Sequence, residues 1–439
     1  MNLPYFLAKN VARGGGRSVS RTIIGIAVVA VAISMATMVI ASALINGFKN
    51  EISTKIFGFW GHIHITDDAA SYGIFDTYNY PLSNRQDYYP SLDTTGRVTV
   101  RSFDDGLGNG TRLVTTNGGI DHIQQFIVLP GIVSVYQEGE RLPTQEALVL
   151  KGIAEDYNWD NFGQYLIEGE ELRIHPDSVS RGMLISSITA RRLRLKVGDR
   201  IDYAYIGSAG QERPRAFTVR GIYKTGLEEF DRQFALVDIK QPRALLGWAD
   251  DQIGGFEITL DDLDDLELFN DYIHYDVLSR DQYAETIRRK FSELFSWLDI
   301  QDYNFAVVLI LMVIVAIINM MTALLILILE RTNMIGTLKA LGQSNWGIRQ
   351  IFLYYAAFII LGGVLLGNLL GLGLCWVQKT FGLITLDEDS YYLAVAPIDV
   401  DWPTVLALNV GTLVVTLAFL VLPSYLITRV DPVKAIRFK

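Results

Sequence analysis

Two histidines and one acidic run are the residues whose types and spacing could support chemistry in this sequence. His62 and His64 alternate in a short apolar stretch, so a strand would place both imidazoles on one face, where a metal ion could bind. No third ligand is placed beside them, and we expect both rings to face solvent. The acidic run 261–265 lacks the glycine and the terminal glutamate of a calcium-binding loop, which favours a solvated helix start.

Motifs for catalysis are absent from the sequence. It contains no G-x-S-x-G nucleophile elbow and no phosphate-binding P-loop. Its single cysteine, Cys375, lies inside an apolar run, so one chain can build neither a disulfide nor a cysteine metal site. We therefore predict no catalytic residue, no metal ligand and no cofactor bound by this chain, and the sequence argues against an enzyme.

The composition indicates a membrane protein with a water-soluble part. The 439 residues are 50% hydrophobic and 20% charged, with a mean hydropathy of +0.24. A chain of this composition is too apolar for an ordinary soluble protein and too charged to consist of membrane helices alone. The net charge of -10 argues against a nucleic-acid partner, because a phosphate-binding surface needs a local excess of lysine and arginine.

Four segments lack Asp, Glu, Lys, Arg and His and are long enough to cross a membrane, which takes about 20 apolar residues in a helix. We predict four transmembrane α-helices and a large α+β outer domain inserted between helices 1 and 2. The predicted organisation is an N-terminal arm and first helix over 1–47, the outer domain over 48–303, helix 2 over 304–329, a cytoplasmic loop over 330–349, helix 3 over 350–378, an outer loop over 379–401, helix 4 over 402–428 and a tail over 429–439.

The distribution of basic residues predicts the orientation. The N-terminal arm, the loop between helices 2 and 3, and the tail each carry more lysine and arginine than acid, although the whole chain is at -10. Because basic loops stay in the cytoplasm, we expect both termini there and the large domain outside. A cleaved signal peptide is the alternative for the first span, since Ala41-Ser42-Ala43 has small-x-small spacing. The apolar run before it is longer than the roughly 7 to 15 residues of a signal peptide, which favours a retained span.

The outer domain shows two kinds of periodicity. Residues 62–66, 97–100 and 215–219 alternate between apolar and polar side chains, which predicts strands with one buried face. Residues 188–195 and 279–298 show helical patterns. The second of these leads almost directly into helix 2, so we expect a long helix that couples the outer domain to the membrane.

The spans contain small and polar residues at helical spacing. Gly363, Gly367 and Gly371 recur every four residues, which lets helix backbones approach closely in lipid. We expect them to pack against a neighbouring span of the same chain rather than a ligand, and polar residues such as Asn368 to find partners across helices. No ionisable residue lies within the spans, which argues against a proton relay, an ion path or a secondary transporter.

One face of the first span is soft and weakly polar. It is formed by Ser34, Met38, Ser42 and Ile45, which recur at helical offsets. Such a face could contact lipid-like cargo or a second subunit, although packing within the chain is the commoner role of such a face.

The cytoplasmic loop contains a short amphipathic helix. Met334, Ile335, Leu338 and Leu341 follow helical periodicity, and Gly342 is well placed to end the helix. Such a helix could lie on the membrane or dock into a partner's groove, and the pattern does not choose between these.

Several short motifs resemble one family. Residues 336–342 (Gly-Thr-Leu-Lys-Ala-Leu-Gly) resemble the coupling helix of the FtsX and MacB superfamily of ABC-transporter permeases, and residues 46–52 resemble the end of the first span in its lipoprotein-releasing members, LolC and LolE. The likeness covers nearly the whole chain, in the same order. Further stretches similar to their MacB-like periplasmic domain and C-terminal motif are 182–186, 195–199, 221–226 and 431–437.

The resemblance implies a permease half that dimerises and binds two separate ABC ATPase subunits of the LolD kind, which supply ATP and Mg. It implies a Gram-negative inner-membrane location and extraction of triacylated lipoproteins from the outer leaflet for transfer toward the outer membrane. The predicted site residues are, for the ATPase contact, Asn333, Met334, Ile335, Gly336, Leu338, Lys339, Ala340, Leu341 and Gly342; for a substrate or dimer face, Met38, Ser42, Ile45, Asn46 and Phe48; and, for helix packing, the three glycines.

Two departures from the family leave alternatives open. Met334 stands where many members have glutamate, so we expect the charged part of the ATPase contact to differ. The loop 206–215 is shorter than the hook by which LolC is thought to engage a periplasmic lipoprotein chaperone, which leaves chaperone docking and the choice between a homodimer and a LolC/LolE-type heterodimer open. The other functions are FtsX-like mechanotransmission to a cell-wall hydrolase, although such outer domains are usually smaller, and MacB-like efflux, although MacB carries its own ATPase.

Overall fold

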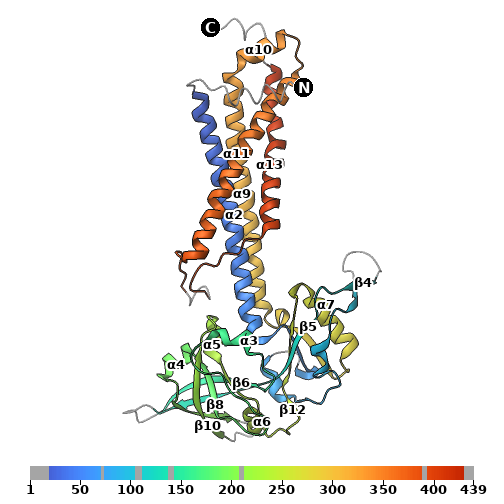
Figure 1. Cartoon of the computed structure of the whole chain (residues 1–439), viewed down its shortest axis with the longest axis vertical. Helices are drawn as coiled ribbons and strands as arrows, with labels where there is room; N and C mark the ends of the chain where they lie inside the picture. Colours follow the sequence, from blue (N-terminus) through green and yellow to red (C-terminus); the bar gives the residue numbers. More distant parts are fainter. Residues whose placement is uncertain are drawn as a thin grey trace. The chain divides into compact units, whose positions relative to one another are not determined.

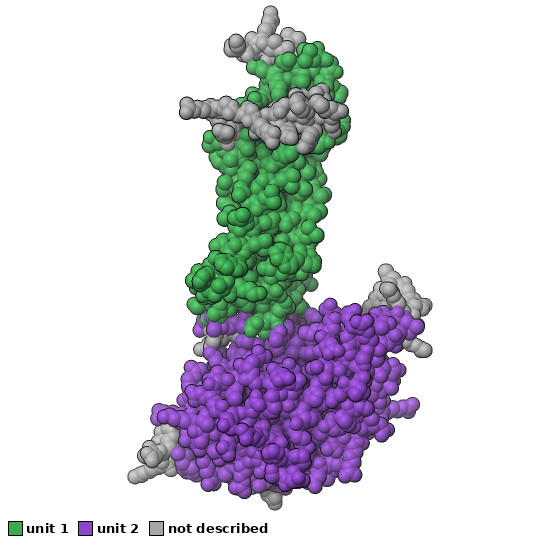
Figure 2. Space-filling model, in the orientation of Figure 1, with its two compact units in different colours: residues 1–51, 297–386, 395–439 green, residues 52–296, 387–394 purple. Residues whose placement is uncertain are grey.

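The computed structural model describes residues 19–70, 74–103, 111–136, 143–206, 212–387 and 393–429. The chain forms two compact units, coloured separately in Figure 2. The helical unit comprises residues 1–51, 297–386 and 395–439, and the sheet unit comprises residues 52–296 and 387–394. The predicted motif at 431–437 and the cations Lys9, Arg13 and Arg17 of the N-terminal arm lie outside the described residues.

Four long helices account for the predicted spans, and they run alongside one another in the helical unit (Figure 1). Each is long and apolar enough to cross a membrane. The predicted fold class, four transmembrane helices with a large α+β domain between the first and the second, is confirmed. The helices are α2 (Val19–Trp60), α9 (Ser292–Glu330), α11 (Asn345–Phe381) and α13 (Trp402–Ser424), and the last continues into the 3-10 turn η7 (Tyr425–Arg429).

The helices extend past the ends of the charge-free runs. α2 continues through Lys49 and Glu51 to Trp60, because charged residues end an apolar run but are good helix formers. The true ends follow the capping rules. The Ser344 side chain accepts a hydrogen bond from the Gly347 N–H at the start of α11, and Gly382, with φ at 57°, ends it.

The sheet unit is built on one large mixed sheet of ten strands, in the order β14-β1-β13-β5-β6-β11-β8-β10-β7, with β9 pairing with β10 and β5. The strands are β1 (Ile63–Asp67), β5 (Ile120–Val135), β6 (Thr144–Ile153), β7 (Leu166–Gly169), β8 (Gly182–Ser186), β9 (Arg200–Ile206), β10 (Glu212–Tyr223), β11 (Phe234–Asp238), β13 (Gly255–Leu260) and β14 (Gln282–Thr286). Two small ladders pair β2 (Leu82–Ser83) with β12 (Gln252–Ile253) and β3 (Thr99–Phe103) with β4 (Thr111–Thr115).

The centre of this sheet is buried on both faces. β8 and β11 are buried at every position, which is why both read as unbroken apolar runs. β11 pairs in parallel with β6, and β8 pairs in parallel with β10, whereas most other pairs are antiparallel. The short helices of the unit are α3 (Trp159–Phe162), α4 (Ser187–Leu193), α5 (Glu228–Gln233), α6 (Lys240–Leu246), α7 (Leu266–Tyr272) and α8 (Ile287–Lys290).

The structure corrects one predicted helix. The patterns at 62–66, 97–100 and 215–219 overlap β1, β3 and β10, and the helix predicted at 188–195 overlaps α4. The helix predicted over 279–298 is wrong in its first half, where β14 pairs with β1 along its whole length. β14 alternates between buried and half-buried side chains, so cross-strand packing at this sheet edge overrides the local helical signal.

Candidate functional site

The predicted cytoplasmic helix is α10 (Thr332–Ala340), and Gly342, with φ at 87°, follows it in a left-handed conformation that suits glycine. Ile335 and Gly336 are buried, so two of the predicted ATPase-contact residues face the helical unit. Ile335 packs in a cluster with Ile348 and Phe352 of α11. α10 is therefore anchored by one buried face to the start of the next long helix.

The opposite side of α10 is open. Asn333 and Ala340 are exposed, as are Leu341 and Gly342, and Met334 and Leu338 are half-buried against the core. Leu341 is 79% exposed, so it offers apolar surface at the end of the helix. The Lys339 Nζ donates to the Thr428 carbonyl oxygen of η7 at 3.2 Å. The exposed face of α10 is thus available to a partner.

The three glycines of α11 face α2. A Cβ at Gly363 would lie 2.7 Å from the Val31 Cβ, and one at Gly367 would lie 2.6 Å from the Met35 Cβ. At Gly371 the nearest atoms would be those of Ala36, at 3.2 Å. The contacts at Gly363 and Gly367 leave no room for a side chain, and those at Gly371 are tight, so small residues let the backbones of α2 and α11 approach closely.

A polar contact joins α11 to α13. The Asn368 Nδ2 donates to the Asn409 Oδ1 at 2.5 Å, and also to the Val364 carbonyl oxygen of its own helix at 2.8 Å. Side-chain amides at membrane depth carry donors that lipid cannot satisfy, and these two satisfy each other.

Two residues of the predicted substrate or dimer face are buried within the chain. Met38 and Ser42 are buried inside the helical unit, where Met38 packs with Val405 and Leu408 of α13. A residue with no exposed surface cannot contact lipid or a second subunit in this conformation. In a helix that is apolar all round, spacing alone does not reveal which face is buried.

The remaining members of that face join α2 to its neighbours. Ile45 and Asn46 are half-buried, and the Phe48 ring packs edge-on against Trp297 of α9, with centroids 5.7 Å apart. Beside them the Lys49 Nζ lies 2.6 Å from the Asp302 Oδ2. The end of the α2 segment in the helical unit is therefore held to α9 by a ring contact and a partly exposed ion pair.

The two histidines are also placed differently from the prediction, which had them facing solvent. His64 is fully buried, and its Nε2 donates to the Trp60 carbonyl oxygen at 2.7 Å. The Nδ1 of His62 accepts a hydrogen bond from the Leu260 N–H at 2.8 Å. Burial lowers the pKa of His62 to about 4 and that of His64 well below its usual range, so both are neutral structural residues.

A buried ion pair that the sequence pattern did not reveal lies beside His64. Lys151, on β6, has no exposed surface, and its Nζ lies 2.8 Å from the Glu257 Oε1 of β13. The same Nζ donates to the Phe59 carbonyl oxygen and lies 4.6 Å from the centre of the Trp60 ring. A cation at the carbonyl end of α2 stabilises that helix end. The sequence signal that could have revealed this ion pair is a single lysine inside an otherwise apolar run.

A second buried lysine has no such partner. The Nζ of Lys290, in α8, is buried with no hydrogen-bond partner among the described residues, although part of its stem is exposed. Burial lowers its pKa to about 8, against an ordinary value of 10.5. The unfolded chain thus holds this proton more tightly than the folded chain, which destabilises the fold fully below pH 8 and progressively less up to about pH 10.5.

Replacing Lys290 by methionine is therefore expected to stabilise the protein near neutral pH by up to about 3 kcal/mol. The gain should vanish above about pH 10.5, where both states of the wild type are neutral. Thermal unfolding of the full chain in detergent at several pH values measures it. A methionine variant no more stable than the wild type at neutral pH contradicts the prediction.

The acidic run opens a helix, as predicted, but it is not fully solvated. Residues 263–265 form a 3-10 turn that leads into α7. Asp265 is buried and accepts hydrogen bonds from the Asn117 and Gly118 N–H groups, at 2.6 and 2.9 Å. The carboxylate therefore holds a loop in place and is not available to a metal.

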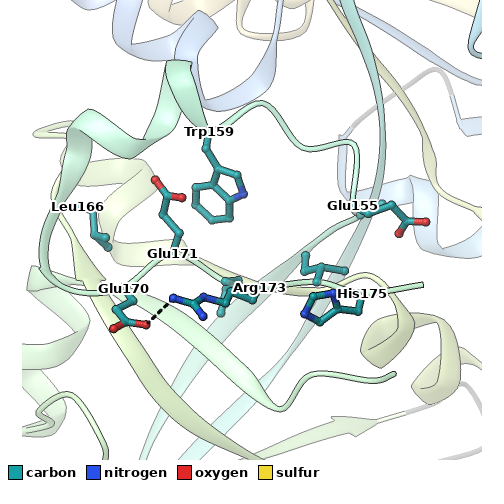
Figure 3. Close-up of a pocket in the computed structure, with 10 residues that line it drawn as sticks. Glu155, Trp159, Leu166, Glu170, Glu171, Arg173 and His175 are labelled. Atoms are coloured by element: carbon teal, nitrogen blue, oxygen red, sulfur yellow. Dashed lines mark ion pairs between the residues drawn. The ribbon is translucent and has the colours of Figure 1, made fainter. Parts of the chain in front are cut away.

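The sheet unit also contains a hollow of about 680 Å³, lined by α3 and by the segment that follows β7 (Figure 3). Trp159 and Glu171 are among its lining residues, and Arg173 forms an exposed ion pair with Glu170, at 3.7 Å. No residue predicted from the sequence lines it. Among the described residues, no group of three or more His, Cys, Asp or Glu side chains is arranged to hold a metal ion.

Comparison with known families assigns the chain. The family model described as MacB-like periplasmic core domain matches residues 24–274, which is more than half of the chain, and the model described as FtsX-like permease C-terminal matches residues 306–432. The chain belongs to the FtsX and MacB family of permeases. The resemblance predicted from the motifs around 336–342 is confirmed. In this permease the second match contains α10 and the glycines of α11.

Curated relatives of this FtsX/MacB permease are named as transmembrane proteins of lipoprotein-releasing systems. The lipoprotein-releasing system transmembrane protein LolE of Haemophilus influenzae is 23% identical, over 99% of this chain and 99% of its own. LolC of Neisseria meningitidis serogroup B is 21% identical over 94% of each chain. LolC of Xylella fastidiosa is 25% identical over 52% of this chain and 56% of its own. The likeness to LolE and to the Neisseria LolC covers the helical and sheet units alike.

Proposed function

We propose that this chain is the membrane subunit of an ATP-driven transporter that extracts lipoproteins from the outer leaflet of the inner membrane. The observation that carries the proposal is the likeness to LolE over 99% of both chains, which includes the sheet unit as well as the helices. In a two-unit permease of this kind, the sheet unit lies on the side of the membrane where the cargo is released, and the helices move the sheet unit. In this arrangement both termini and α10 lie in the cytoplasm, because the basic segments lie at that end.

The exposed face of α10 is the contact for a separate ATPase. A partner that binds Asn333, Ala340 and Leu341 would also move Ile335, because all four residues belong to one short helix or its C-terminal end. Ile335 is packed against α11, and α11 is locked to α2 through the glycine contacts. Movement of α10 therefore passes into the long helices without any chemistry in this chain. The partner ATPase, of the LolD kind, supplies the ATP and Mg.

A second permease subunit completes the transporter. Large apolar side chains are exposed along each of the four long helices, including Val29 of α2, Ile310 of α9, Leu365 of α11 and Val414 of α13. These surfaces fit lipid and a second permease copy or a LolC/LolE-type partner. The substrate or dimer contact proposed here lies on such exposed faces and not at Met38 or Ser42.

The ATPase contact is tested with Leu341→Asp. A charge at the centre of an apolar contact should weaken binding by about 30-fold or more, so the cognate ATPase should no longer copurify and ATP hydrolysis by the complex should fall. Leu113→Asp is the matched control, because Leu113 is an exposed leucine of the sheet unit. Equal recovery of the ATPase with both variants would show that α10 is not the contact.

The cargo is tested by depletion of the protein in its own cells. Mature lipoproteins should then accumulate in the inner membrane. Normal delivery to the outer membrane, with loss of a cell-wall hydrolase activity instead, would replace the proposal with FtsX-like mechanotransmission.

A further inference from the structure

A buried arginine lies at the α10 end of the helical unit, with no anionic side chain paired to it among the described residues. Arg349, in the second turn of α11, is 9% exposed, and its Nε has no hydrogen-bond partner among the described residues. Its guanidinium lies over the Tyr425 ring of η7, 3.8 Å from the ring centre. A ring face partly offsets the desolvation of a cation, but a buried charge normally also has a counter-ion.

A second cation approaches the same turn. The Lys339 Nζ donates to the Thr428 carbonyl oxygen, so Lys339 and Arg349 contact residues only three apart in η7. One cation comes from the last turn of α10 and the other from α11. Two positive charges on one short turn create a local field that attracts an anion.

The helix itself adds to this field. α11 is 37 residues long and begins at Asn345, one turn before Arg349. The first N–H groups of a helix have no acceptor within it, and the helix end carries a partial positive charge. In α11 the Ser344 side chain already caps the Gly347 N–H, so the N–H groups before Gly347 are the ones that could meet an anion. Arginine is unfavourable there by itself, whereas a bound phosphate would be stabilised by both the N–H groups and the guanidinium.

The surrounding side chains mark the headgroup layer of a membrane. Trp346 and Tyr425 are exposed aromatic residues at this end of the helices, and Leu341 and Leu426 are exposed apolar ones. Trp and Tyr concentrate at the membrane interface, where an apolar body and a polar edge are both accommodated. The anion that this layer supplies is a lipid phosphate.

We propose that Arg349, Lys339 and Tyr425 bind the phosphate of an anionic phospholipid in the leaflet on the α10 side. The lipid would lie beside the exposed apolar residues, with its phosphate at the start of α11. The bound lipid would hold η7 to α10 and α11, and would so keep the buried face of α10 packed against the start of α11.

The test uses the delipidated full chain in detergent, offered equal amounts of phosphatidylglycerol and phosphatidylcholine, with bound lipid counted by native mass spectrometry. Arg349→Gln should lower phosphatidylglycerol occupancy about fivefold, and Arg349→Lys should lower it less, since a lysine also binds phosphate but lacks the planar group that stacks on Tyr425. Lys379→Gln is the matched control, because Lys379 is an exposed cation at the opposite end of α11. Tyr425→Leu, at an exposed position, should also lower occupancy and provides a second variant if Arg349→Gln does not fold.

Three results would overturn the proposal. Equal phosphatidylglycerol loss in Arg349→Gln and Lys379→Gln would mean that only overall charge matters. Protection of the wild type against thermal unfolding by inorganic phosphate alone, as strong as that by the lipid, would make the ligand a free phosphate. Loss of ATPase copurification in Arg349→Gln with unchanged lipid binding would make the site a protein contact.

Discussion

Replacing Lys151 by methionine is expected to destabilise the sheet unit by about 3–5 kcal/mol, because it leaves the Glu257 carboxylate buried without a cation. Glu257 would retain the hydrogen bond from the Gln124 Nε2, at 2.8 Å, which does not replace the lost charge. Thermal and denaturant unfolding of the full chain, followed by a signal from the sheet unit, measures the loss.

A double variant separates the charge from the packing. In Lys151→Met with Glu257→Gln both charges are gone, and the new amide can still accept from Gln124, so most of the stability should return. Arg289→Met is the control, since its ion pair with Glu267 is half-exposed on both sides, and removal should change stability by less than about 1 kcal/mol. A double variant as unstable as the single one would show that the loss comes from the lysine's packing instead.

Gly367→Ala is expected to destabilise the helical unit, by about 1–3 kcal/mol, although it adds a single methyl group. The new Cβ would lie 2.6 Å from the Met35 Cβ and 2.7 Å from the Ala32 carbonyl oxygen, so α2 and α11 would have to separate. We expect a lower thermal midpoint in detergent. We also expect reduced ATP-driven activity, because in the proposed function movement of α10 reaches α2 through this contact.

Gly362→Ala provides the control on the same helix. A Cβ at Gly362 has nothing within 4 Å, so this variant should be neutral or slightly stabilising through the better helix propensity of alanine. Identical thermal midpoints for the two variants would contradict the close packing of α2 against α11.

The sequence was sufficient for features with a strong local signal. The four spans follow from charge-free runs, and α10 follows from the spacing of Met334, Ile335 and Leu338 together with Gly342. The glycines of α11 showed a close approach by their spacing, yet the spacing did not identify α2 as the helix that they approach.

Features that depend on distant residues could not be predicted. Lys151 and Glu257 are 106 positions apart, so no local pattern connects them. The strand β14 is set by its pairing with β1, more than two hundred residues earlier in the chain, and its own sequence looked helical. The sequence does not show whether Met38 faces lipid or the interior of the chain, because an apolar helix offers no polar stripe to show which side is buried.

The most direct test of the account is lipoprotein release from liposomes that contain this chain, its cognate ATPase and a triacylated lipoprotein. With ATP and Mg, lipoprotein should pass to a soluble acceptor, and the Leu341→Asp variant should abolish this passage while its thermal midpoint stays that of the wild type. ATP hydrolysis by the wild-type complex that leaves all of the lipoprotein in the membrane, with the acceptor present, would contradict the account.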